Sequence, residues 1–244
     1  MRVVILVSLF PPKWLAGTEI ATYNIAKHLA KRGHEVYIIT QHDRDLPKET
    51  FEEGFRVYRI SVPKIRFGGL FYILKELLLV KRLNPDIVHA QSIWRGLACF
   101  LAKKLFHIPC VVWCQGSDVY LPWMFKGLIS KFVLSNADIL IALTEHMKKK
   151  IYDLLGYERN DVFVIPNGVD LKLFDGCADK LSQPSLKTER NERVILYVGR
   201  LVPVKGVKYL VEAMKILKNR GLKNVKLLII GDGTERKSLE ELVK

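Results

Sequence analysis

Short apolar runs alternate with amphipathic segments along most of this chain of 244 residues. The run RVVILVS at 2–8 is continuously apolar, which is typical of a strand buried on both faces of a parallel sheet. Residues 18–31 then repeat their apolar positions at helical spacing, and Gly33 follows as a helix terminator. The same alternation predicts strands at 34–40, 54–61, 86–92, 109–115, 138–142 and 161–170, and helices at 69–83, 93–106, 124–135 and 144–155.

This order of elements predicts an α/β fold with a doubly wound parallel sheet. Strands that alternate with helices over short loops pair in parallel, and the helices cover both faces of the sheet. Ligands of such sheets bind at the carboxyl ends of the strands. We therefore expect the site in the loops at 8–19, 89–95, 115–122 and 166–171.

The pattern stops in a polar stretch and then resumes. Residues 171–192 read as a linker between a Rossmann-like N-terminal domain, 1–170, and the beginning of a second Rossmann-like domain, 193–244. Two strands with two helices bury too little apolar surface for an independent domain. We expect the second domain to be incomplete, so that the chain is cut, a partner supplies the rest, or this piece packs on the first domain. Its strands are expected at 193–198 and 225–230, and its helices at 206–218 and from about 235.

The net charge of +14 favours acidic partners, such as nucleotides, phosphates, anionic lipid or nucleic acid. Nucleic acid is excluded because the chain contains no known nucleic-acid-binding motif and its basic residues are scattered. Cys110 and Cys114 lie in an apolar run and no CxxC pair occurs, so we expect core thiols, no zinc site and a reducing, cytoplasmic location. The N-terminal apolar run lacks a small-residue cleavage site, so we do not interpret it as a signal peptide.

Two cations lie on a short turn in LYVGRLVPVKGVKYL, residues 196–210. Arg200 and Lys205 separate an apolar strand from a helix that begins near Gly206. A helix N-terminus carries unpaired N–H groups and a positive dipole end, and two added cations suit a diphosphate better than a single carboxylate. The alternative is two solvated charges in a chain rich in lysine.

Several motifs, taken in order, resemble one family. YVGRLVPVKGVKYLVEA and LLIIGDG resemble the start of the C-terminal domain of a retaining GT-B glycosyltransferase of family 4. In the N-terminal half, the pattern of that family is matched by PPKWLAGTEIATYNIAKHLAKRGHEVYIIT, PDIVHAQS, QGSDVY, ADILIALTEHMKK and VIPNGVDLKLF. The resemblance covers essentially the whole chain.

The resemblance implies transfer of a sugar, with retention, from a nucleotide-sugar donor to a glycan or lipid-linked acceptor, without a metal ion or cofactor. Arg200 and Lys205 match the basic pair that neutralises the donor diphosphate. Gly17 matches a glycine where the backbone approaches the donor, and Gly231 and Gly233 match a turn near the nucleotide. Consistently, no G-x-G-x-x-G follows the first strand and no His/Cys ligand cluster occurs.

Four further residues match the family at or near the expected site. Gln115 stands where the family often has His, so we place it with the catalytic candidates as a residue that positions substrate without shuttling a proton. Asp118 is expected to contact a sugar hydroxyl or to cap a turn. His89 is expected either to contact acceptor or sugar or to pack in the core, and Glu19 either to contact sugar or to stabilise a helix first turn. Ala16 replaces the first of two glycines usual in the family.

One family feature is absent from this sequence. Two glutamates separated by seven residues, which in the family grip the donor sugar and the ribose, do not occur. We therefore expect the chain to be a fragment with little activity alone. The alternative function is a non-catalytic membrane-docking or scaffolding subunit completed by a partner chain, and a GT-B-like epimerase is less consistent with the motifs.

Two segments combine basic, aromatic and leucine residues, at 64–83 and 120–132. This composition suits a helix lying on anionic lipid, so peripheral contact with the inner face of a membrane is expected. The alternative is a core-facing helix with a solvated basic face.

Overall fold

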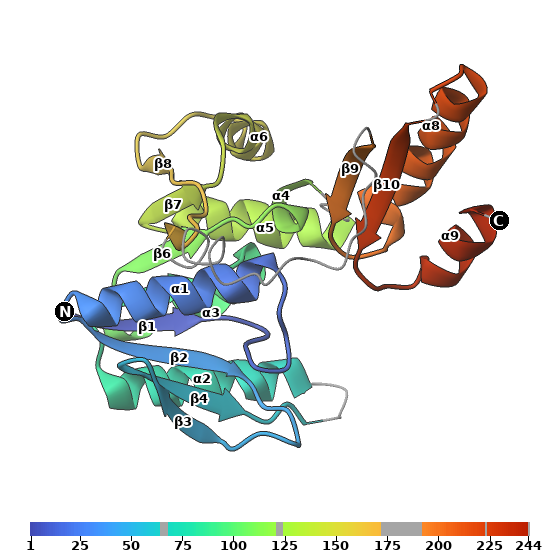
Figure 1. The fold of residues 1–244 in the computed structure, drawn as a ribbon. Coiled ribbons are helices and arrows are strands. Elements are labelled where there is room, and N and C mark those ends of the chain that lie inside the picture. The colour runs from blue at the N-terminus through green and yellow to red at the C-terminus, as the bar shows by residue number, and fades with distance from the viewer. Residues whose placement is uncertain (64–67, 121–123, 172–191, 223, 244) are drawn as a thin grey trace. The chain divides into compact units, whose positions relative to one another are not determined.

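The computed structural model describes residues 1–63, 68–120, 124–171, 192–222 and 224–243 (Figure 1). The chain divides into two compact units, Met1–Val169 and Asp170–Lys244. All of the expected linker except its two end residues lies outside the described residues.

The described part of the first unit is built on a sheet in the order β3-β4-β2-β1-β5-β6-β7-β8. Neighbouring strands pair in parallel, except that β3 pairs antiparallel with β4 at one edge. The strands are β1 (Arg2–Leu6), β2 (Glu35–Gln41), β3 (Glu49–Glu52), β4 (Phe55–Ile60), β5 (Ile87–Ala90), β6 (Cys110–Trp113), β7 (Ile139–Ala142) and β8 (Val162–Val164).

Helices cover both faces of this sheet, because successive residues of a buried strand point to opposite faces. Val3 and Ile5 of β1 pack in a cluster with α1, whereas Val4 and Leu6 pack in the cluster that contains α2, α3, α5 and α6. The helices are α1 (Gly17–Lys31), α2 (Gly68–Leu83), α3 (Ile93–Phe106), α4 (Ser117–Tyr120), α5 (Met124–Asn136) and α6 (Glu145–Leu155). The predicted doubly wound α/β class is confirmed.

Most expected elements form, with three differences. The sheet is not wholly parallel, because the unpredicted β3 forms a hairpin with β4; its four residues alternate only between exposed and half-buried. The short helix α4 was also not predicted. The last strand, expected over 161–170, is confined to β8, just before Pro166 and Gly168. Gly33 adopts φ +83° directly after the C-cap Arg32 of α1, as a helix terminator should.

The expected core thiols, Cys110 and Cys114, are buried, and so is Cys99, for which no prediction was made. Cys99, Cys110 and Cys114 have no exposed surface, and burial raises the pKa of Cys99 and Cys114. The thiol of Cys99 donates to the carbonyl of Val88 at 3.1 Å, so its one polar group is satisfied inside the core. Cys177 lies outside the described residues.

The second unit pairs two parallel strands, β9 (Arg193–Val198) and β10 (Val225–Ile230), in its described part. A 3₁₀ turn, η1 (Pro203–Lys205), leads into α8 (Val207–Asn219), and α9 (Arg236–Val243) follows β10. Leu201, Val207, Val211 and Leu239 form a small core against one face of the strands. Leu196, Val198 and Ile230 remain exposed, so these two strands do not bury all their apolar side chains.

A buried polar cluster joins α2 to α3 in the first unit. The guanidinium of Arg95 donates to Glu76 at 2.8 Å and lies 4.9 Å from the ring centre of Tyr72. Glu76 has no exposed surface, and burial raises its pKa to about 7 although Arg95 opposes the shift. The second carboxyl oxygen of Glu76, the hydroxyl of Tyr72 and Nε of Arg95 have no partner within the described chain.

The raised pKa of Glu76 predicts a loss of stability as the pH rises. Glu76 ionises in the unfolded chain near its ordinary value of 4.5 but retains its proton in the folded chain up to about 7. Its stabilising contribution is therefore complete below pH 4.5 and falls by about 3 kcal/mol as the pH rises through about 7. Glu76→Gln carries no titrating group, so the stability of the variant minus that of the native chain should increase over this window.

Urea unfolding at several pH values from 4.5 to 8 measures this difference. Glu158→Gln serves as the control, because Glu158 is exposed and its replacement should leave the difference flat. Parallel pH profiles for Glu76→Gln and the native chain would contradict the prediction.

Candidate functional site

The carboxyl ends of the central strands meet at one edge of the first sheet. The ladder continues past the strands, because the N–H of Val7 donates to Ile39 at 3.0 Å and the N–H of Gln91 donates to Leu6 at 2.9 Å. The N–H of Cys114 likewise donates to Ile141 at 2.9 Å. The loops that follow β1, β5 and β6 therefore begin side by side, at the edge where the sequence predicts ligand binding.

Two glutamines connect the ends of β5 and β6. The side-chain amide of Gln115 donates to Oε1 of Gln91 at 2.8 Å. Gln91 is 1% exposed, whereas Gln115 is half-buried. Gln91 therefore holds Gln115 in place, and Nε2 of Gln91 has no partner in the described chain.

Asp118 ties the same two loops together through the backbone. One carboxylate oxygen accepts from the N–H of Ile93 at 3.0 Å and the other accepts from the N–H of Gln115 at 3.1 Å. Burial raises the pKa of Asp118, and these N–H groups oppose the shift. These hydrogen bonds connect the start of α3 to the end of β6, and both the capping of a following turn by Asp118 and its contact with a sugar stay predictions.

His89 lies on β5 and packs against β6. Its ring stacks on Trp113, with centroids 5.6 Å apart and planes within 8°. His89 is 8% exposed, and burial lowers its pKa to about 4, so the ring is neutral at pH 7. His89 Nε2 and Trp113 Nε1 are both buried without a partner in the described chain. His89 is therefore packed in the core, and the nitrogen atoms His89 Nε2 and Trp113 Nε1 remain without hydrogen bonds to the described residues.

The loop after β1 leads into α1 without a side-chain cap. Ala16 is the N-cap in an extended conformation, φ −106°, which alanine adopts as readily as glycine. No atom of a packing neighbour in the described part of the chain lies within 4 Å of the position where a Cβ on Gly17 would stand, so this packing does not require glycine there. Glu19 lies in the first turn of α1, and one of its carboxylate oxygens is buried without a partner within the described residues.

An apolar pocket of about 510 Å³ lies beside this loop. It belongs to the region 8–19 that the sequence associates with ligand binding. Its lining combines proline, aliphatic and tyrosine side chains of the loop and α1 with one carboxylate from β3, and consists of Pro11, Pro12, Leu15, Ile20, Tyr23 and Glu52.

In the second unit, the loop between β9 and α8 carries the two predicted cations. Arg200 and Lys205 are both exposed, and neither side chain forms an ion pair with the described residues. Lys205 ends η1, and Gly206 then adopts φ +64° as the N-cap of α8. No side chain caps α8, whereas Ser92 and Thr144 cap α3 and α6.

The two glycines of the GDG turn allow a close approach of two backbones. A Cβ on Gly231 would stand 1.9 Å from the carbonyl oxygen of Gly199, and one on Gly233 would stand 2.2 Å from that of Leu201. Hydrogen bonds from Gly199 to Ile230 and from Leu201 to Asp232 extend the pairing past the strands. The structure thus assigns both glycines a packing reason, and their contact with a donor stays a prediction.

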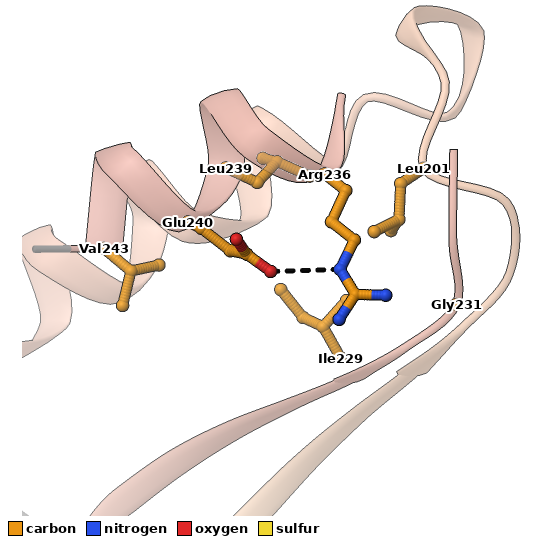
Figure 2. A pocket seen from close by; sticks show the side chains of 7 residues that line it. All are labelled: Leu201, Ile229, Gly231, Arg236, Leu239, Glu240 and Val243. Atoms are coloured by element: carbon orange, nitrogen blue, oxygen red, sulfur yellow. Dashed lines mark hydrogen bonds and ion pairs between the residues drawn. The ribbon is translucent and has the colours of Figure 1, made fainter. Parts of the chain in front are cut away.

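A cavity of about 450 Å³ lies on the α9 side of the second unit, and Gly231 contributes to its wall (Figure 2). The guanidinium of Arg236 is held by Glu240 at 3.0 Å, next to the apolar part of the lining. Arg200 and Lys205 do not belong to this lining, which consists of Leu201, Ile229, Gly231, Arg236, Leu239, Glu240 and Val243.

Comparison with models of known protein families shows to which family this chain belongs. The model described as Glycosyltransferase Family 4 matches residues 15–173, more than half of the chain. The model described as Glycosyl transferases group 1 matches residues 179–244. The chain belongs to glycosyltransferase family 4.

Relatives of this family 4 chain are known from archaea and bacteria. An uncharacterized glycosyltransferase of Methanocaldococcus jannaschii is 29% identical over 99% of this chain and 66% of its own length. A GDP-mannose-dependent alpha-mannosyltransferase of Corynebacterium glutamicum is 29% identical over all of this chain and 60% of its own. The chain thus spans less than two thirds of the length of these relatives.

The solved structures confirm the fold. The Anabaena protein HepE, solved in complex with UDP, superposes with a TM-score of 0.75 at 20% identity. The superposition covers 99% of this chain and 64% of HepE. The predicted GT-B fold of family 4 is therefore confirmed, with the described second unit corresponding to part of a Rossmann-like domain.

The sequence reasoning on this family 4 chain missed two residues at the sheet edge, Gln91 and Trp113. Both stand at alternate positions beside residues that it did select, since Gln91 follows His89 by two and Trp113 precedes Gln115 by two. The period of two along a strand was the available signal, because it places each pair on one face.

The bridge made by Asp118 predicts a stability effect in this family 4 chain. Asp118→Asn leaves one acceptor oxygen for two N–H groups and turns an NH₂ group toward one of them. Unfolding free energy should fall by about 1–3 kcal/mol, the usual effect of leaving a buried donor unsatisfied. Urea unfolding at pH 7 measures this change.

Asp153→Asn is the matched control, because Asp153 is exposed on α6 and its contact with Lys150 is 3.9 Å long. Equal stability of the Asp118 and Asp153 variants would show that the bridge contributes little.

Proposed function

We propose that this chain provides the acceptor-side domain and part of the donor-side domain of a retaining glycosyltransferase. The enzyme moves a sugar from a nucleotide-sugar donor to a glycan or lipid-linked acceptor. The activity is proposed for a protein that carries the donor-binding elements of its longer relatives. We expect little turnover from residues 1–244 alone, because the two glutamates that the family resemblance implies do not occur among them.

One observation carries this proposal: two exposed cations precede an uncapped helix. Arg200 and Lys205 lie on one short loop at the carboxyl end of β9, and α8 begins immediately afterwards. A diphosphate placed there would accept hydrogen bonds from the first N–H groups of α8 and neutralise both cations. The absence of an ion pair within the described chain leaves these charges available for a ligand.

The same loop supplies the catalytic effect that the reaction needs. When the bond between sugar and diphosphate breaks, negative charge develops on the leaving diphosphate. Arg200 and Lys205 would stabilise the diphosphate more strongly as this charge develops than they stabilise it in the intact donor. This difference lowers the barrier of the reaction. The leaving diphosphate then helps to deprotonate the acceptor on the same face of the sugar, and no metal ion or cofactor is part of the proposal.

The first unit contributes an opening at the start of α1. Among the described residues outside its own helix turn, no atom lies within 4 Å of the position of a Cβ on Gly17, and α1 has no side-chain cap. A ligand group can therefore approach the backbone of this loop closely, as a donor phosphate or sugar would. The relatives support a nucleotide-sugar donor, since one is named GDP-mannose-dependent and HepE was solved with UDP.

Binding of nucleoside diphosphates tests the role of the two cations. UDP and GDP should bind residues 1–244, and Arg200→Ala or Lys205→Ala should each weaken the tighter of the two at least about 10-fold, since each variant removes a charge-assisted hydrogen bond. Isothermal titration calorimetry measures the dissociation constants. Lys215→Ala is the matched control, an exposed lysine further along α8.

The proposal fails for these residues if Arg200→Ala and Lys205→Ala bind as tightly as Lys215→Ala. UMP and GMP provide an internal comparison, because they lack the second phosphate and should respond less to either variant.

We also propose peripheral contact with the inner, cytoplasmic face of an anionic membrane, through the outward face of α2. Leu70, Phe71, Leu74 and Leu78 are exposed along this helix although all are large and apolar. Lys75, Lys81 and Arg82 are exposed on the same helix. Such a surface can bury leucine side chains at a bilayer surface while its cations contact lipid phosphates. Among the described residues, no helix is long and apolar enough to cross a bilayer.

Vesicle flotation tests this contact. The chain should float with vesicles that contain phosphatidylglycerol, and replacement of Leu74 and Leu78 by Glu should lower the bound fraction at least about 10-fold, because two buried leucines are lost. Ile216→Glu is the control, since Ile216 is an exposed apolar residue on α8. Equal flotation of both variants would contradict membrane contact by α2.

A further inference from the structure

Three side chains on one side of the first sheet each have a nitrogen atom without a partner among the described residues. His89 Nε2, Gln91 Nε2 and Trp113 Nε1 are all buried and have no hydrogen-bond partner within the described chain. Their residues are 8%, 1% and 6% exposed. An unsatisfied buried polar group costs about 1–3 kcal/mol, so three such nitrogen atoms on one face indicate that another molecule satisfies them.

Strand register places these three groups together. The rings of His89 and Trp113 stack at 5.6 Å, which puts both on the same face of β5 and β6. Gln91 follows His89 by two residues and lies one step beyond the paired residues Ala90 and Val112, so it is level with Trp113 on that face. Gln115 adjoins the group through its hydrogen bond to Gln91.

This face is the one covered by α1. Trp113 belongs to a cluster of buried residues against which Ile25 of α1 packs. Glu19, in the first turn of α1, also has a buried carboxylate oxygen without a partner in the described residues. Among the described residues, the α1 side of the sheet thus has unpartnered nitrogen atoms on the strands, and the first turn of α1 has an unpartnered carboxylate oxygen.

The charges of the group favour a neutral ligand. His89 is uncharged at pH 7, because burial lowers its pKa to about 4. Gln91 and Trp113 are neutral, and Glu19 would repel an anion. A phosphate is therefore disfavoured, whereas the hydroxyls of a sugar both donate and accept and can satisfy all of these groups at once.

We propose that His89, Gln91 and Trp113 form a sugar-hydroxyl subsite on the α1 side of the sheet edge, in which the indole N–H of Trp113 and the amide of Gln91 hydrogen-bond ring hydroxyls. The subsite deepens the glycosyltransferase function proposed above and rests on it for the nature of the ligand. The sugar comes from either the donor or the acceptor, since both present the same hydroxyl chemistry.

The indole signals of the chain report on this subsite without any assay of turnover. The sequence holds four tryptophans, so a ¹⁵N-labelled sample gives four indole N–H signals, and Trp113→Phe identifies one of them by its loss. Phenylalanine keeps an aromatic ring against His89 while removing the N–H. Methyl glycosides of glucose, mannose and galactose, the nucleotide sugars UDP-glucose and GDP-mannose, and plain UDP and GDP are the probes.

We expect the Trp113 signal to shift with sugar-bearing probes and not with plain nucleotides. A shift with methyl glycosides assigns the subsite to the acceptor sugar, and a shift with nucleotide sugars alone assigns it to the donor sugar. Gln91→Leu should weaken the same probe at least about 10-fold, the effect of one lost hydrogen bond. Trp94→Phe, on α3, is the control and should leave the affinity unchanged.

The subsite is refuted if no sugar-bearing probe moves the Trp113 signal, which would indicate that water alone occupies the niche, or if Gln91→Leu binds like the native chain. Urea unfolding of each variant verifies that it is folded. Nucleotide binding that depends on Arg200 without any Trp113 shift would leave the proposed function intact and reject the subsite. Glycoside binding without nucleotide binding would support the subsite and reject the proposed function.

Discussion

The parallel pairing of β1 with β2 on one side and β5 on the other is the constraint on which the first unit depends. Buried parallel strands satisfy their backbone groups only through both neighbours, so their direction and register are fixed together. Once that register is set, the chain leaves β1, β5 and β6 at one edge. Gln91 and Gln115 then meet, and Asp118 reaches two backbone N–H groups on adjacent loops.

The same constraint explains why the edge holds unsatisfied polar groups. A strand that alternates between two buried faces must bury whatever side chain stands at each position. His89 and Trp113 are buried by packing, and neither His89 Nε2 nor Trp113 Nε1 has a partner among the described residues. Evolution of an ordinary core would replace such groups by apolar residues, because an unpartnered N–H costs free energy. Their presence at the carboxyl edge of the strands agrees with the proposal that a polar ligand satisfies them.

In the second unit, glycine residues allow two loops at the strand ends to pack closely. The loops after β9 and β10 run so close together that a Cβ would not fit at Gly231 or Gly233. Leu201 is buried in the small core of the second unit, while its neighbour Arg200 is exposed to solvent. Exposed Arg200 and buried Leu201 thus alternate along the loop. The glycines serve the packing of the loops, and Arg200 and Lys205 remain exposed to solvent.

The sequence by itself determined the order of most elements, the mostly parallel α/β class, the family and the pair of cations after β9, because hydrophobic period and ordered motifs are local signals. It could not predict β3, whose four residues form a strand only by pairing with β4. Nor could it show that the carboxylate of Asp118 accepts from the N–H groups of Ile93 and Gln115, or find the grouping of His89, Gln91 and Trp113. Those depend on which residues of separate strands stand level with one another, and register is decided only when the whole sheet packs.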